Sequence, residues 1–460
     1  MPSLLPTRKP VLICRTARKA PKYLFSPDPS IVSASSSFSL KKIAVAAYGP
    51  SLLFGMVEGA IYPVIALSAR NLGASIAEAG LIVALTGVGA LLNNIPASLL
   101  TARFGERLSM TGAALLAIVA LLLCVSAANP VVFGIGIFMI GMAQSVFLLA
   151  RQTYLTDAVP ISMRARALST LGGVMRIGLF ISPFISALLM QIMGLDGAYW
   201  LAAIAAAAAG ALAFTLPDLE SRKKAPGRSG TQLNDPRKTA DSTEKDTVRQ
   251  QTDESTKGPA SANPSTMAGR KSISTVLREH RRAYLTLGSS CLLVSALRAS
   301  RQVVIPLWAA HIMLDAATTS VIYGAMGAID MLLFYPAGKI MDRYGRQWVA
   351  LPSMAIMGIA LLLMPLTGNF WTFLLATMLL GLGNGIGSGL VMTVGADCSP
   401  ANARPQFLGL WRFMTDIGTC GGPLLVSGIA AAAGLASGIL AVSSAGFIAA
   451  AMFWKWLPRQ

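Results

Sequence analysis

The chain has 460 residues, of which 54% are hydrophobic and only 13% are charged, and its formal net charge is +18. This composition excludes an ordinary water-soluble protein of that length. Five scattered cysteines without a CxxC pair argue against a disulfide framework or metal cluster, and two histidines argue against a His-rich site. We therefore expect no metal and no cofactor.

The N-terminal segment, residues 1–43, is rich in serine and basic residues, with Asp28 as its only acid. That composition is typical of an organellar transit peptide. Two alternatives stay open, a disordered cytoplasmic tail and an upstream start codon that adds residues never made in the cell. We expect residues 1–43 to form a disordered tail.

From residue 44 onward, apolar runs of about 20 residues recur, the length that crosses ~30 Å of hydrocarbon as a helix. None has the polar face that a helix on a soluble surface needs. We therefore predict an all-α polytopic membrane protein with twelve transmembrane helices. The runs are 44–68, 76–100, 108–128, 131–150, 167–193, 198–216, 284–312, 318–339, 348–367, 370–395, 406–432 and 436–455.

A polar segment, residues 217–283, divides these runs into two sets of six, 44–216 and 284–457. It is rich in Ser, Thr, Pro and Gly and carries charges of both signs, so we expect a disordered cytoplasmic linker. Its end, "ISTVLREHRRAY", is either a short amphipathic helix on the inner membrane surface or a plain solvated linker end.

The two sets of six form an internal repeat with a constant offset of 240 residues. "DAVPISMR" aligns with "DCSPANAR" in the same register as many glycines and prolines. With an even number of spans per copy, the halves share one orientation and are related by a pseudo-twofold axis along the membrane normal. The pattern is that of a transporter.

Lys and Arg gather in the connections on one side of the predicted membrane, with Arg70 as the exception. The positive-inside rule then makes both termini cytoplasmic. Basic residues beside membrane ends face anionic lipid, so the charge of +18 does not indicate nucleic acid. We expect a plasma-membrane protein, or an organelle-membrane protein if residues 1–43 are a transit peptide.

The residues resemble the major facilitator superfamily over 44–457. "GKIMDRYGRQ" is similar to the family's loop signature between spans 8 and 9, and "SLLTARFGER" is a degraded copy between spans 2 and 3. Spans 5 and 11 resemble the family's antiporter signature, which implies the twelve-span, drug/proton antiporter-like branch. The arginine that this branch carries in span 4 is replaced by Ile137, with Thr377 as its counterpart in span 10.

The loop signature suggests a cytoplasmic latch. Asp342 is expected to lie against the positive end of span 11, and Gly345 to permit the tight turn. The N-terminal copy has Ala102 in place of the acid, so we predict one working latch, in the C-terminal half. The alternative is that the cations only set topology. The latch residues are Gly338, Asp342, Arg343, Gly345 and Arg346, with Arg103 and Gly105 in the other copy.

Charged residues inside the spans are candidates for substrate or proton contact, because each is costly in hydrocarbon. The alternative for each is a structural ion pair. Aligning Pro63 with Pro306 places Glu58 opposite Arg301, and the resemblance implies that spans 1 and 7 line a central cavity. The candidates are Glu58, Arg298, Arg301, Asp330, Arg176, Arg412 and Asp416.

Small residues and prolines in spans 5 and 11 permit close approach and bending. We expect them to form the surfaces on which the halves slide, with static packing as the alternative. They are Gly178, Pro183, Gly418, Gly422 and Pro423.

Together these patterns predict a monomeric secondary active transporter that works by alternating access. The favoured activity is export of a small organic molecule coupled to proton entry through Glu58, Asp330 or Asp416. The alternatives are uptake of a polar metabolite by symport or facilitated diffusion, and a transport-dead membrane sensor. No nucleophile–base set or phosphate-binding loop indicates an enzyme.

Overall fold

The computed structural model describes residues 40–159, 164–216, 273–400 and 403–457. These residues are almost entirely helical, and they include no strand. Ten of the described helices are long and apolar enough to cross a membrane, or eleven if the bent pair α1 (Leu40–Ile61) and α2 (Ile65–Asn71) forms one span. The two helices of that pair meet at 41°. The prediction of an all-helical polytopic membrane protein is therefore confirmed.

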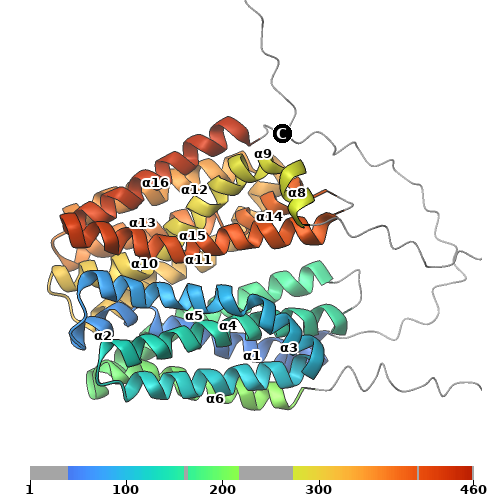
Figure 1. Cartoon of the computed structure of the whole chain (residues 1–460). Helices are drawn as coiled ribbons and strands as arrows, with labels where there is room; N and C mark the ends of the chain where they lie inside the picture. The colour runs from blue at the N-terminus through green and yellow to red at the C-terminus, as the bar shows by residue number, and fades with distance from the viewer. Residues whose placement is uncertain (1–39, 160–163, 217–272, 401–402, 458–460) are drawn as a thin grey trace, which may run out of the picture.

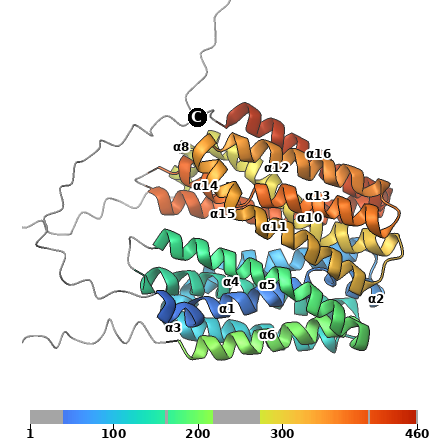
Figure 2. The same cartoon turned by 180° about the vertical axis from the view of Figure 1, so that it is seen from behind.

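The helices gather in two bundles that lie one above the other, one blue to green and one yellow to red (Figure 1). The view from behind shows the same separation (Figure 2). The first bundle contains α1, α2, α3 (Ile76–Val125), α4 (Pro130–Ala158), α5 (Arg164–Met193) and α6 (Asp196–Phe214). The second contains α8 (Ile273–Glu279), α9 (Arg281–Ala283), η3 (Tyr284–Gly288), α10 (Ser289–His311), α11 (Ala316–Tyr344), α12 (Gln347–Leu363), η4 (Met364–Leu366), α13 (Phe370–Ile386), α14 (Leu390–Cys398), α15 (Arg404–Ala433) and α16 (Leu435–Trp456).

Helix α3 is 50 residues long because two helices join at Gly105, whose φ of 77° and ψ of 168° are not helical. Gly345, between α11 and α12, has a similar φ of 95° and ψ of 168°. Both dihedral pairs lie in a region that only glycine enters readily. The two glycines occupy the same position in the two loop signatures, so the repeat extends to the backbone.

The offset of 240 residues recurs at several other turns. Gly73 and Met313 both have positive φ, 92° and 62°, and so do Gly194 and Gly434, at 65° and 88°. Helix N-caps also match: Ser75 and Asp315 accept from the backbone at the start of α3 and α11, and Asn129 and Asn369 at the start of α4 and α13.

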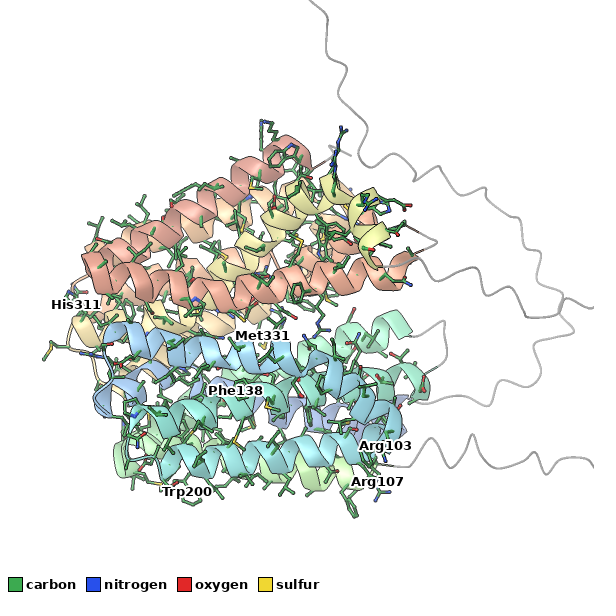
Figure 3. All side chains as sticks on the ribbon, viewed as in Figure 1. Arg103, Arg107, Phe138, Trp200, His311 and Met331 are labelled. Atoms are coloured by element: carbon green, nitrogen blue, oxygen red, sulfur yellow. The ribbon has the colours of Figure 1, made fainter. Side chains whose placement is uncertain are left out.

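One end of the molecule carries the basic loops. Arg103 and Arg107 lie at this end, and His311 lies at the opposite end (Figure 3). We call these the basic end and the far end. Helix α8 forms at the end of the predicted linker and packs against α15, so that stretch is helical. Val276 of α8 is buried and Leu277 is exposed, which gives the short helix two unlike faces.

The glycines of the predicted helix-bend motif lie inside the bundles. A Cβ on Gly178 of α5 would meet the backbone of Leu52 in α1, and a Cβ on Gly418 of α15 would meet the equivalent backbone of Leu292 in α10. Gly422 meets the backbone of Ala296 in the same way. The expectation that these glycines form sliding surfaces between the halves is therefore corrected. They let two helices of one bundle pack at backbone distance.

Gly178 has a matched control on its own helix, since a Cβ on Gly172 would meet no heavy atom within 4 Å. Replacing Gly178 with Val should force α1 and α5 apart and lower the free energy of unfolding by about 1–3 kcal/mol. Gly172→Val introduces the same side chain into the same helix without that clash. Thermal unfolding of the two purified variants provides the measurement, and equal midpoints would contradict the packing described here.

Candidate functional site

The two bundles meet along two helix pairs, α3 with α15 and α5 with α11. Small residues bring the helices together: a Cβ on Gly87 would lie 2.9 Å from the Cys420 sulfur, and one on Gly324 would lie 2.7 Å from the Phe184 ring. Both contacts lie in the part of the helices nearer the far end. The bundles are therefore in direct contact on the far side of the membrane centre.

Two polar links lie further along these helix pairs. On one side Arg176 of α5 pairs with Asp330 of α11 at 3.0 Å. On the other side Asn94 of α3 donates to Asp416 of α15 at 3.0 Å. Arg176 and Asp416 occupy equivalent positions in the repeat. Each bundle therefore contacts the other bundle through a residue at the same position of the repeat.

The Arg176 guanidinium has further neighbours in the second bundle. It donates to the Ser388 hydroxyl, and it lies 4.6 Å from the centre of the Phe334 ring. Asp330 precedes Met331, which lies at the junction of the two bundles (Figure 3). Among the predicted candidates, Arg176 and Asp330 are the pair that the structure joins by a salt bridge between bundles.

Beyond these links, toward the basic end, several glycines of α5, α11 and α15 have open space beside them. Gly172 lies one turn before Arg176, and Gly338 lies two turns after Asp330. Cβ atoms on Gly172, Gly173, Gly338 or Gly409 would meet no heavy atom within 4 Å. Open space therefore borders α5, α11 and α15 on the basic side of the two links.

A cavity of about 160 Å³ lies between the bundles at this level. Both bundles contribute polar side chains to its wall, which is otherwise formed by small and apolar residues. The predicted candidates Arg412 and Asp416 line it, as does Pro423. Its other polar lining residues include Tyr62, Asn94, Gln144 and Gln302.

Glu58 is buried beside this cavity, with only 5% of its surface exposed. Gln144 of α4 donates to its carboxylate at 2.7 Å and also contacts the Tyr62 hydroxyl at 3.1 Å. The carboxylate also interacts electrostatically with the positive charge of Arg151, which is on α4 as well. The expected pairing of Glu58 with Arg301 is therefore not formed.

Arg298 and Arg301 lie on one face of α10. Arg298 donates to the carbonyl of Gly387 at 2.5 Å, and the charged groups that act on it are Asp330, Arg176 and Arg301. Arg301 lies beside the hydroxyl of Tyr323. The Nε atoms of both arginines are buried without a hydrogen-bond partner.

The structure also changes which residue is equivalent to Glu58. The contacts of Gly178 with Leu52 and of Gly418 with Leu292 keep the offset of 240 through the first spans of each copy. Glu58 is therefore equivalent to Arg298. The alignment of Pro63 with Pro306 shifted the pairing to Arg301 by three residues, because these prolines are not equivalent.

Sequence reasoning missed Gln144 and Arg151. Arg151 lies just past the end of the apolar run 131–150, so it was not counted among the charges inside a span. Gln144 and Arg151 are seven residues apart, which places them on one face of α4 two turns apart. A search for polar residues at helical spacing within each span would have found the pair.

In the latch, Arg346 makes the longer-range contact. Its Nε lies 3.0 Å from Asp397 of α14, and its guanidinium lies 3.5 Å from Asp342. The Asp342 side chain is 81% exposed and contacts Arg346 one turn away, in place of the expected N-terminal end of α15. In the other copy Glu106 stands at the position of Arg346 and cannot pair with an acid.

These contacts predict unequal roles for the two acids. Asp397→Asn removes the partner that ties the loop to α14, whereas Asp342→Asn removes only a partner within the loop. We expect flux to fall several-fold in Asp397→Asn and to change less in Asp342→Asn. Both bridges are partly exposed, so the free energy of unfolding should change by less than about 1 kcal/mol. Transport by the two isosteric variants in vesicles is the measurement, and the reverse order would contradict the assignment.

The link between Arg176 and Asp330 can be tested by a double-mutant cycle. Neutralising either partner leaves the other charge unpaired and should lower the free energy of unfolding by about 1–3 kcal/mol. Arg176→Gln with Asp330→Asn should recover much of that loss. Chemical unfolding of the four proteins gives the coupling energy. Additive effects would show that the pair does not join the bundles.

The described residues form two helical bundles with a polar cavity between them. The sequence matches the Major Facilitator Superfamily over residues 51–299 and again over residues 287–460. The chain therefore belongs to this superfamily, and the predicted resemblance is confirmed at that level.

Solved structures with the same fold are distant in sequence. The nucleoside transporter NupG matches with a TM-score of 0.63 at 13% identity, over 90% of this chain and 98% of that chain. A D-xylose-proton symporter matches at 0.67 and 14%, over 91% and 98%. A POT family transporter matches at 0.68 and 12%, over 90% and 96%. No curated protein sequence matches this chain.

Proposed function

We propose that this chain moves a small organic solute by alternating access of two six-helix halves, residues 44–216 and 284–457. Helix α3 divides at Gly105, and α1 with α2 forms a bent pair, so twelve crossings fit the described helices. The matching turns and caps at an offset of 240 residues support a pseudo-twofold relation between the halves. The observation that carries the proposal is the polar cavity between the bundles.

The basic end faces the cytoplasm in this proposal, because Lys and Arg favour the inner side of a membrane. Contacts between the bundles lie toward the far end, and the glycine faces toward the basic end are open. The conformation is then inward-facing, with the cavity accessible from the cytoplasm. The location is the plasma membrane, with residues 1–43 and 217–283 on its inner side.

Proton coupling is assigned to Glu58. An acid in the membrane centre is expensive unless it is paired or protonated, which makes such a residue a proton carrier. Glu58 accepts a hydrogen bond from Gln144, and Arg151 lies close enough to stabilise the carboxylate. Movement of Arg151 relative to Glu58 during the cycle would change the balance between the protonated and the ionised form of Glu58.

Two directions of transport remain to be separated. The antiporter-like residues of spans 5 and 11 favour export in exchange for protons. Symport is the second candidate, because one solved structure of this fold is a D-xylose-proton symporter. Flux in proteoliposomes with a pH gradient of either sign distinguishes them, and complete absence of flux with retained ligand binding would favour a sensor.

Glu58→Gln removes the titratable group and keeps its size. We expect this protein to exchange solute across the membrane yet fail to concentrate it in response to a pH gradient. The control is Glu78→Gln, in the exposed first turn of α3, where Gln preserves the capping box. Accumulation by Glu58→Gln equal to that of the control would exclude Glu58 and leave Asp330 or Asp416 as the carrier.

A further inference from the structure

The interior of the described spans carries more positive than negative charge. With α3 taken as two spans that meet at Gly105 and α1 with α2 as one span, the side chains at least six residues from either end of a span comprise five arginines and three acids. The arginines are Arg151, Arg176, Arg298, Arg301 and Arg412, and the acids are Glu58, Asp330 and Asp416. Arginine stays protonated in proteins, so a surplus of two positive charges remains at the bundle interface. Such a surplus is costly at membrane depth.

The three acids already have partners. Gln144 donates a hydrogen bond to Glu58, and the positive charge of Arg151 stabilises the same carboxylate. Arg176 forms the 3.0 Å pair with Asp330, and Asn94 donates to Asp416. Arg412 lies one turn before Asp416 on α15 and acts on it. The surplus therefore falls on Arg298 and Arg301.

Among the described residues, neither of these two guanidinium groups forms a salt bridge. Arg298 bonds to a neutral carbonyl, and Arg301 lies beside a neutral hydroxyl. Both Nε atoms are buried without a partner. Gln302, the next residue along α10 and one turn after Arg298, lines the cavity. The part of α10 that carries both arginines therefore borders the cavity through Gln302.

We infer that the solute is an organic anion, bearing a carboxylate or phosphate group that binds Arg298 and Arg301. This inference rests on the proposed function. A guanidinium presents donors in a planar fork that matches carboxylate and phosphate oxygens. Arrival of the anion satisfies the free Nε donors and offsets the surplus charge. The surplus charge, the unsatisfied Nε donors and the position of α10 beside the cavity point to the same ligand.

The test uses the purified full-length protein in detergent at constant ionic strength. Its thermal midpoint is measured with succinate, citrate, benzoate and glycerol 3-phosphate, each beside a neutral amide or alcohol of the same skeleton. We expect at least one anion to raise the midpoint by several degrees, and its neutral counterpart to have no effect. Arg298→Gln or Arg301→Gln should lower the affinity of the protein for that anion at least tenfold. Arg282→Gln, on the exposed start of the same span, should leave it unchanged.

The unliganded variants give a second readout that a structural role would not produce. Because each substitution removes a surplus cation, the midpoint without ligand should stay equal or rise. Arg298→Lys keeps the charge without the planar fork and should bind the anion with intermediate affinity.

The inference is wrong if no anion stabilises the protein, if the neutral counterparts stabilise it equally, or if the Gln variants bind as the wild type does. Flux in proteoliposomes separates this failure from that of the proposed function. Transport of a neutral solute without anion binding would retain the transporter and reject the anion. Anion binding without any flux would reject the transporter and retain the anion site.

Discussion

The constraint on which this structure depends is that hydrocarbon offers no partner to a charge. Each interior charge must therefore find its counterpart inside the protein. Where helices of different bundles meet, a charge on one bundle can pair with a group on the other. Asp330 and Asp416 lie at that interface with partners from the other bundle. Glu58, by contrast, finds Gln144 and Arg151 within its own bundle.

The two copies of the repeat share geometry and differ in chemistry. Equivalent positions carry Glu58 and Arg298, Arg176 and Asp416, and Glu106 and Arg346. In each case the sign of the charge is reversed between the copies. A repeat with the same charge at both positions would place like charges in matching environments. Reversal lets one copy supply what the other lacks, as Arg176 does for the second bundle through Asp330.

Most of the fold could be predicted from the sequence, because apolar run length and an exact repeat offset are strong and local signals. Each predicted run overlaps one or two described helices, although 76–100 and 108–128 share α3 and the runs 44–68 and 370–395 are each broken between two helices. The site was harder to predict. The candidate charges could be named from their depth, but their partners depend on helix rotation and tilt, which no run length encodes. Glu58 was expected to face Arg301 and instead contacts Gln144. In the latch, the acid that ties the loop to another helix is Asp397, where Asp342 was expected.

The constant offset of 240 residues has a further consequence for the connections between helices. Between Leu52 and Gly194 in one copy, and between Leu292 and Gly434 in the other, equivalent turns and caps are separated by the same numbers of residues, although their sequences differ. Loops that only joined helices would drift in length, since added residues in a flexible loop cost little. Here the turns work as spacers of fixed size that set the height of each helix relative to the next.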